Sequence, residues 1–165
     1  MSLRLPRNAT VLMDTNLAIL LCVGISGPQN IEKHKRLRGD YDEQDYYLLV
    51  KLLGNNSKLV FSPYVLGETS NLVRQVADPL KSQLVLILRD VILLADEIQM
   101  SCAKIVNDSR YLDLGITDAA LLSILDEHPQ LALLTADAKL YIAASAKGRT
   151  ALNFSHIQDQ RPDFQ

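Results

Sequence analysis

The chain has 165 residues, of which 48% are hydrophobic and 22% charged, proportions typical of one globular domain with a buried core. Intrinsic disorder is thereby excluded as the main state. The 17 basic and 19 acidic side chains give a formal charge of −2. The whole molecule therefore lacks the positive field of a general nucleic-acid binder, and any phosphate contact must come from a local patch.

Cysteine content and the distribution of apolar residues indicate the cellular compartment. Cys22 and Cys102 are too few for a disulfide framework or a zinc site, and we expect both to be buried in a reducing environment. Charged residues such as Asp14 interrupt every long apolar run, so no bilayer-spanning segment is predicted. The first residues also lack the pattern of a secretory signal peptide. We therefore expect a cytoplasmic protein.

Short strand-like runs alternate with longer helix-like runs, which is typical of an α/β domain with a mainly parallel sheet. The scarcity of glycine and proline makes an all-β sandwich improbable. In the first part of the chain, the pattern predicts a strand over 10–13, a helix over 17–23, a loop over 26–30, a helix over 43–53 and a strand over 58–61.

Helix-start signals organise the rest of the chain. Ser62 as N-cap before Pro63 predicts a helix to about residue 76, and Asp78-Pro79 begins another. No repeat or linker is present, so we expect a single domain over residues 1–165. The further elements predicted are a helix from 79 to about 88, an edge strand over 91–94, a helix over 96–106, a helix opening at 115–117 with Thr117 as its cap, a strand over 131–134, a helix over 135–146 and a strand over 151–154.

Four acids stand just past a strand or near the start of a helix: Asp14, Glu68, Asp118 and Asp137. In a parallel α/β sheet, ligands bind in the crevice outside the carboxyl ends of the strands, so we expect the four side chains to converge there. Carboxylates brought that close raise each other's pKa unless a cation neutralises them. An all-oxygen cluster of this kind selects Mg²⁺ or Mn²⁺ over zinc.

Each acid also has a purely structural interpretation, because helix N-termini favour carboxylates. Asp14 is placed to be an N-cap, Asp118 to complement a helix dipole and Asp137 to be an ordinary first-turn acid. Glu68 is the hardest to explain in this way, since Ser62 already caps its helix. Taken singly, the acids leave both interpretations open.

Taken together with their neighbours, the acids make the chain resemble the PIN-domain ribonuclease family. The matching segments occur in the family's order and spread over nearly the whole chain. They are Val11-Leu-Met-Asp14-Thr-Asn16, Ser62-Pro-Tyr-Val-Leu-Gly-Glu68, Leu114-Gly-Ile-Thr-Asp118-Ala-Ala-Leu and Leu133-Leu-Thr135-Ala-Asp137-Ala-Lys-Leu140.

The resemblance implies a Rossmann-like α/β/α sandwich and a Mg²⁺- or Mn²⁺-dependent endoribonuclease, a hydrolase of RNA phosphodiesters. It implies that Asp14, Glu68, Asp118 and Asp137 are the metal-binding catalytic quartet. Asn16 and Thr135 would then hydrogen-bond those carboxylates or a bound water. Many family members are toxins of toxin–antitoxin pairs, so a cognate antitoxin protein and a homodimer are further expectations. The chain is longer than a compact family toxin, which predicts an insertion around residues 25–56.

Basic residues supply candidate RNA contacts, although ordinary solvated surface charge is the commoner meaning of such a pattern. A run of them precedes three tyrosines at 41, 46 and 47, a combination that can bind phosphates and stack a base. Two further candidates lie on elements that adjoin the acidic edge. The candidate RNA-binding residues are Lys33, Lys35, Arg36, Arg38, Arg74 and Lys139.

Other classes of enzyme fit less well. A phosphatase of the haloacid dehalogenase type needs a second Asp where Asn16 stands, and a phosphoacceptor receiver domain needs paired acids after the first strand. No glycine-rich phosphate loop follows a strand. The three histidines are widely separated and are expected to be solvated. The alternative that stays open is a non-enzymatic PIN-fold module that binds a protein partner.

Overall fold

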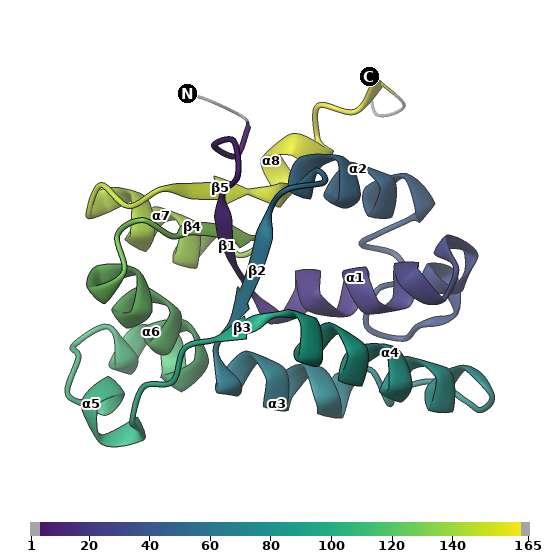
Figure 1. Ribbon diagram of the computed structural model, residues 1–165, viewed down its shortest axis with the longest axis horizontal. Helices are drawn as coiled ribbons and strands as arrows, with labels where there is room; N and C mark the ends of the chain where they lie inside the picture. The colour runs from purple at the N-terminus through teal and green to yellow at the C-terminus, as the bar shows by residue number, and fades with distance from the viewer. Residues whose placement is uncertain (1–3, 163–165) are drawn as a thin grey trace.

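A five-stranded, all-parallel sheet with helices on both faces forms the centre of the computed structural model, which describes residues 4–162 (Figure 1). The strand order is β3-β2-β1-β4-β5. This arrangement confirms the predicted α/β sandwich with its parallel sheet. The strands are β1 (Thr10–Met13), β2 (Lys58–Phe61), β3 (Asp96–Glu97), β4 (Ala132–Thr135) and β5 (Ala151–Asn153).

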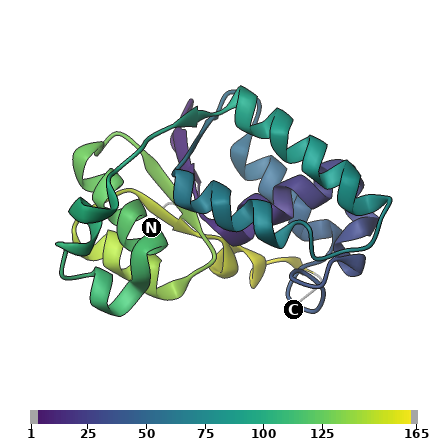
Figure 2. The same ribbon diagram turned by 90° about the horizontal axis from the view of Figure 1, so that it is seen from below.

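The helices divide between the two faces according to the direction in which the chain travels. From β1 the chain moves outward through β2 to β3, and the connections place α1 (Thr15–Ser26), the 3₁₀ helix η1 (Pro28–Lys33), α2 (Glu43–Leu53), α3 (Pro63–Leu72) and α4 (Leu80–Leu94) on one face. It then returns to β4 beside β1, and α5 (Cys102–Val106), α6 (Tyr111–Glu127) and α7 (Ala138–Ala146) cover the other face (Figure 1). Figure 2 shows the same division from below.

The reversal creates a topological switch point between β1 and β4, which are paired neighbours in the sheet. At such a point, the connections that leave the two strands diverge to opposite faces and open a crevice at the carboxyl edge. The last helix, α8 (Phe154–Gln158), follows β5 at this same edge and was not predicted from the sequence.

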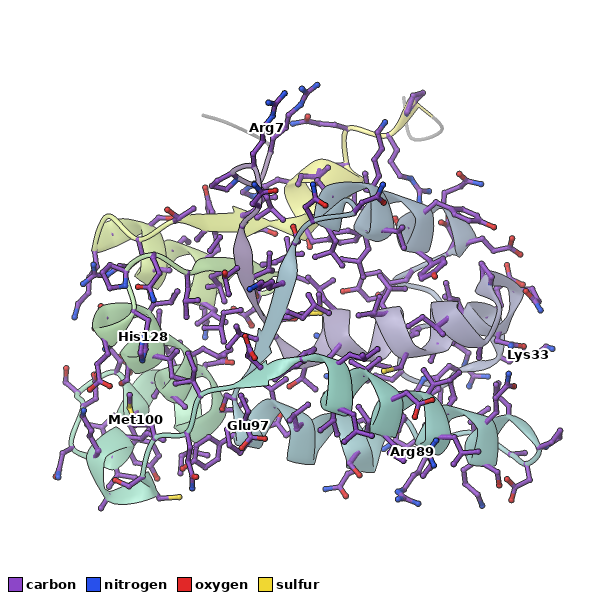
Figure 3. All side chains as sticks on the ribbon, viewed as in Figure 1. Arg7, Lys33, Arg89, Glu97, Met100 and His128 are labelled. Atoms are coloured by element: carbon purple, nitrogen blue, oxygen red, sulfur yellow. The ribbon has the colours of Figure 1, made fainter. Side chains whose placement is uncertain are left out.

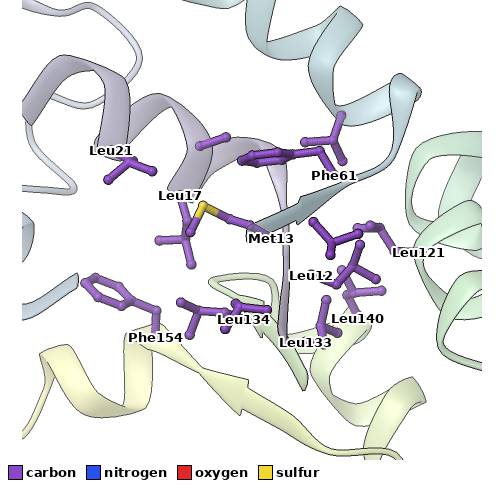
Figure 4. Packing of buried hydrophobic residues seen from close by; sticks show 14 of the residues in the cluster. Leu12, Met13, Leu17, Leu21, Phe61, Leu121, Leu133, Leu134, Leu140 and Phe154 are labelled. Atoms are coloured by element: carbon purple, nitrogen blue, oxygen red, sulfur yellow. The ribbon is translucent and has the colours of Figure 1, made fainter. Parts of the chain in front are cut away.

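The core lies on both faces of the sheet because successive strand residues point in opposite directions. Leu12 pairs with Leu133 and Met13 with Leu134, and each of these side chains is buried. The two sets separate in Figure 4. Met13 and Leu134 lie with Leu17 and Phe154 toward α1, whereas Leu12 and Leu133 lie with Leu121 and Leu140 toward α6 and α7.

The segment predicted as an insertion, 25–56, consists mainly of η1 and α2, which pack against α1. Gly24 of α1 is required for this packing. A Cβ atom at that position would lie 2.0 Å from the ring of Tyr46 in α2, so no larger residue fits unless the ring moves. This segment is thus folded onto the first helix and returns toward the carboxyl edge of the sheet.

Several predicted boundaries agree with the structure. Strand 58–61 and helix 43–53 have the predicted bounds, and Ser62 caps α3 with Pro63 at its first position. Helix α3 ends at Leu72 rather than near residue 76, and α1 extends from Thr15 to Ser26 rather than over 17–23. Within residues 4–162, no helix is both long and apolar enough to cross a membrane.

The region 91–106 was predicted incorrectly. Residues 91–94 form the last turn of α4 rather than a strand, because the spacing of the buried Leu84 and Leu88 continues to Val91, which packs partly buried against the core, whereas Leu93 and Leu94 are exposed. The edge strand is the short β3, and the expected helix over 96–106 is reduced to α5, which Ser101 caps. Cys22 is buried as expected, but Cys102 is exposed because it begins this surface helix.

Candidate active site

The carboxyl ends of β1 and β4 place two acids beside each other at the switch point. Asp14 directly follows β1, and Asp137 comes two residues after the end of β4. Both are helix N-caps: Asp14 accepts a hydrogen bond from the backbone N–H of Leu17 at 3.2 Å, and Asp137 accepts one from that of Leu140 at 2.9 Å. The structural role considered from the sequence is therefore present, and it also fixes where the two carboxylates lie.

Asp14 is the most firmly held of the four acids. Its second oxygen accepts hydrogen bonds from the hydroxyl of Thr135 and, at 3.0 Å, from the backbone N–H of Ala136. Burial raises the pKa of Asp14, the hydrogen bonds from Thr135, Leu17 and Ala136 act in the opposite direction, and the charge of Asp137 raises it further. The result is a buried carboxylate with a fixed orientation.

Thr135 connects Asp14 with Asp137. Besides donating to Asp14, its hydroxyl oxygen accepts a hydrogen bond from the backbone N–H of Asp137 at 2.9 Å. The contact with a carboxylate that was expected for Thr135 is present. Thr135 is fully buried at the end of β4, so the position of this strand determines where both acids lie.

Glu68 reaches the same crevice from the exposed side of α3. One carboxylate oxygen accepts a hydrogen bond from Thr15 at 3.0 Å, and the other accepts one from Thr117. Glu68 is thereby tied to the start of α1 and to the start of the straight part of α6. Sequence reasoning did not assign these two threonines to Glu68, although Thr15 directly follows Asp14 and Thr117 directly precedes Asp118.

Asp118 enters the crevice because α6 is interrupted. Gly115 has φ 79° and ψ 177°, a conformation that favours glycine, and the regular helix that carries Asp118 starts after it. Burial raises the pKa of Asp118 to about 6, with further contributions from the charges of Asp137, Asp14 and Glu68. Its side chain is half-buried and has no hydrogen-bond partner among the residues the structure describes.

The electrostatics of Asp118 indicate that all four predicted acids share one crevice. No Lys, Arg or His forms a salt bridge with any of them within residues 4–162. In the described part of the chain, however, no three His, Cys, Asp or Glu side chains stand close enough together to hold a metal ion. The acids are therefore electrostatic neighbours whose charges are uncompensated, rather than a tightly closed ligand set.

Asn16 differs from expectation. Its Oδ1 accepts a hydrogen bond from Nε of Arg36 at 3.3 Å, and no hydrogen bond to the four acids is recorded among the described residues. Asn16 therefore contacts a basic residue that is 20 positions away in the sequence, in the segment that follows η1.

The other basic candidates are spread out. Lys33 lies at the far end of the molecule from the strands and donates to Asn30 at 3.1 Å (Figure 3). Lys139 is exposed in the first turn of α7, close in sequence to Asp137. Lys35, Arg38 and Arg74 are also exposed. The basic residues at 33–38 therefore do not form one patch beside the acids. Of these residues, Arg36 contacts Asn16, which is close in sequence to Asp14.

The expectation that all three histidines are solvated is wrong for His34, which is fully buried. Its Nδ1 accepts a hydrogen bond from the backbone N–H of Arg36 at 3.2 Å, so the proton is placed on Nε2, which lies 3.4 Å from the carbonyl oxygen of Val73. Burial lowers the pKa of His34. The neutral ring anchors the turn that presents Arg36.

Two hollows of different character lie at opposite edges of the sheet. A mainly apolar groove of about 490 Å³ lies at the amino-terminal edge, among residues that include Leu21, Leu53 and Val91, away from the acids. A polar pocket of about 330 Å³ lies at the carboxyl edge and is lined by Asn16, Arg36, Asp40, Tyr41, Ser155 and Gln158. The polar pocket adjoins the acidic crevice and is called the Arg36 pocket below.

Comparison with known proteins gives little further information. No protein-family model matches the sequence, and no curated protein matches it. Among solved structures, the chain is similar to a domain of a functionally unknown protein from Methanocaldococcus jannaschii, with 16% identity, a TM-score of 0.45, and coverage of 88% of this chain and 90% of that chain.

Proposed function

We propose that this protein is a Mg²⁺- or Mn²⁺-dependent endoribonuclease whose active site is the crevice formed by Asp14, Glu68, Asp118 and Asp137. The observation that carries the proposal is Asp118. Its pKa is raised to about 6 by burial and by three neighbouring carboxylates, and no cationic side chain among the described residues offsets the charge. Closely spaced carboxylates without a neighbouring cation destabilise the folded protein, and they are typical of functional sites rather than of ordinary surface charges.

The donor set has the chemistry that a hard divalent cation prefers, namely carboxylate oxygens with hydroxyl groups beside them. Asp118 and Asp14 would hold the ion, Glu68 would position it or a water, and Asp137 would complete the site. A bound ion would supply the charge that orients and ionises a water for attack on a phosphodiester and that stabilises the leaving oxygen. Metal binding would require the side chains of Asp118 and Asp137 to move toward Asp14, and neither is held at both oxygens by described residues.

The protein's own residues would keep the carboxylates in place. Thr135 and the backbone of Ala136 fix Asp14, whereas Thr15 and Thr117 hold the two oxygens of Glu68. The resemblance of the sequence to PIN-domain ribonucleases supports RNA as the substrate, and we propose that the protein acts on cytoplasmic RNA. A cognate antitoxin and a homodimer remain predictions from the same resemblance.

Cleavage of RNA by the Asp118→Asn variant tests this proposal. Asp118 is the appropriate position because its neutralisation breaks no recorded hydrogen bond, whereas Asn at position 14 would direct an amide toward donors. With Mn²⁺ and total tRNA or short single-stranded RNA, we expect Asp118→Asn to lower the rate at least about 100-fold with little change in RNA affinity. Asp113→Asn is the matched control, since Asp113 is an exposed acid in the first turn of the same helix.

The outcomes separate enzyme from binding module. Metal-dependent cleavage that Asp118→Asn abolishes and Asp113→Asn retains supports the proposal. Cleavage that survives EDTA or Asp118→Asn contradicts it. Absence of cleavage by the wild type would favour the second candidate, a non-enzymatic protein-binding module, for which the capping roles of Asp14 and Asp137 are the specific support.

A further inference from the structure

The Arg36 pocket is built from three segments that are distant in the sequence. Asn16 lies in the first turn of α1, Ser155 and Gln158 lie in α8, and Arg36, Asp40 and Tyr41 lie in the segment between η1 and α2. The three segments meet at the carboxyl edge of the sheet, where the acids lie. The volume of about 330 Å³ is at the lower end of the range for small-ligand sites, about 300–1,000 Å³.

The pocket adjoins the acidic crevice on the side of Asp14. Ser155 donates a hydrogen bond to the carbonyl oxygen of Ala136 at 3.3 Å, and the N–H of the same Ala136 donates to Asp14. On the opposite wall, burial raises the pKa of Tyr41, and the charge of Asp14 is the next largest cause. The pocket is therefore a neighbour of the crevice, although none of the four acids lines it.

Arg36 provides an anion-binding group there. Its side chain is exposed, and the one hydrogen bond recorded for its guanidinium within residues 4–162 goes from Nε to Asn16. It has no carboxylate partner in that part of the chain. A guanidinium with unused N–H donors matches the geometry of a phosphate and binds it through two parallel hydrogen bonds.

Asp40 provides a hydrogen-bond acceptor in the wall of the same pocket. Its carboxylate has no hydrogen bond or salt bridge among the described residues, and its backbone oxygen is bound by Gln158 at 2.8 Å. A pocket with one cation and one carboxylate is poorly suited to a free inorganic anion. It is well suited to a nucleotide, which presents an anionic phosphate together with hydroxyl and N–H donors of the sugar and base.

The walls of the pocket are held rigidly. Gln158 also donates to Asp45 at 2.9 Å, and Arg161 bonds both Asp42 and Asp45 at 2.6 Å. Asp45 and Arg161 are buried, so this ionic cluster connects α2 with the end of the described chain. A pocket whose walls are ordered beforehand loses little conformational entropy when a ligand binds.

We propose that the Arg36 pocket binds the RNA nucleotide adjacent to the scissile phosphate, with Arg36 holding its phosphate and Asp40 accepting from its sugar or base. This inference rests on the proposed function, because the crevice supplies the position of the scissile phosphate. Binding, unlike cleavage, does not require the metal. The pocket can therefore be tested separately from the chemistry.

The test is fluorescence anisotropy of a labelled short single-stranded RNA in EDTA. We expect Arg36→Gln to weaken binding about tenfold or more and to reduce the slope of log K against log salt by about 0.7. Arg7→Gln is the matched control, since it makes the same substitution at an exposed arginine that precedes β1, at the opposite edge of the sheet, and does not line the pocket. We expect it to change the Kd less than about twofold, and Arg36→Lys to restore part of the salt slope but not the full affinity.

Each outcome tests RNA binding by the Arg36 pocket separately from the proposed nuclease activity. Equal weakening by Arg36→Gln and Arg7→Gln means a diffuse charge effect and overturns the pocket, as does wild-type protein that does not bind RNA in EDTA. If Arg36→Gln binds like the wild type while Mn²⁺-dependent cleavage is present, the pocket is wrong and the proposed function stands. Specific weakening without any cleavage supports RNA binding by Arg36 but contradicts the nuclease, and with it the place of the pocket beside a scissile phosphate.

Discussion

Thr135 donates a hydrogen bond to Asp14 across 121 positions of the sequence, joining the end of β4 to the end of β1 at the switch point of the sheet. The same hydroxyl oxygen accepts the N–H of Asp137. One buried side chain therefore orients two of the four acids. The positions of Asp14 and Asp137 therefore depend on the pairing of the two central strands.

Removal of this hydroxyl should be costly. We expect Thr135→Val to lower the free energy of unfolding by about 2 kcal/mol, because it removes a hydrogen bond to a charged group and leaves the buried Asp14 less satisfied. Thr69→Val is the control of equal size, since Thr69 is buried in α3 and its hydroxyl has no hydrogen-bond partner. Urea unfolding should show Thr69→Val to be unchanged or more stable by up to about 1 kcal/mol. Equal losses in the two variants would refute the special role of Thr135.

The raised pKa of Asp118 predicts a pH-dependent gain in stability on neutralisation. In metal-free protein above about pH 6, the ionised carboxylate disfavours the folded state, whereas below about pH 3 it is protonated in both folded and unfolded chains. We therefore expect Asp118→Asn to raise the free energy of unfolding by about 1–2 kcal/mol near pH 7.5 and by almost nothing near pH 3. Denaturant unfolding in EDTA at both pH values is the measurement. A variant less stable than the wild type near pH 7.5 would contradict this prediction and indicate that Asp118 stabilises the fold.

His34 predicts a pH dependence of opposite sign. Because burial lowers its pKa and Arg36 N–H occupies Nδ1, the folded protein resists protonation that the unfolded chain accepts below about pH 6.5. Stability contributed by the neutral ring is thus present above that pH and is lost as the pH falls toward the lowered pKa. We expect His34→Gln to flatten this part of the stability profile, whatever its effect on absolute stability. His156→Gln, at an exposed histidine, should leave the slope unchanged; a similar flattening there would contradict the assignment.

The elements that the sequence predicted well are those with local signals. The apolar run 10–13 and the Ser62-Pro63 cap depend on neighbouring residues, and the structure has β1 and α3 starting there. The branched residues at 91–94 favoured a strand locally, but Val91 and Ile92 pack partly buried against the core as part of α4, and tertiary packing decided the conformation of the segment. The short β3 exists because its backbone pairs with β2, which no local pattern reveals.

The candidate site likewise has residues that the sequence predicted and contacts that it could not predict. The four acids could be named because each follows a strand or lies near a helix start, and Asp118 is electrostatically coupled to the other three. The partners of those acids could not be named, since Thr15 and Thr117 meet Glu68 only after α1, α3 and α6 pack together. Arg36 was one of six basic candidates in the sequence. Its proximity to Asn16 arises because the segment after η1 folds back toward the start of α1.

The central claim is that the acidic crevice binds a divalent cation, and the stabilisation of the protein by Mn²⁺ tests it most directly. Metal that binds only the folded state at about a hundredfold excess over its Kd should raise the free energy of unfolding by about 2.7 kcal/mol and the melting temperature by several degrees. We predict this rise for the wild type and for Asp113→Asn, and its loss in Asp118→Asn. An equal rise in Asp118→Asn, or no rise in the wild type, would contradict the account.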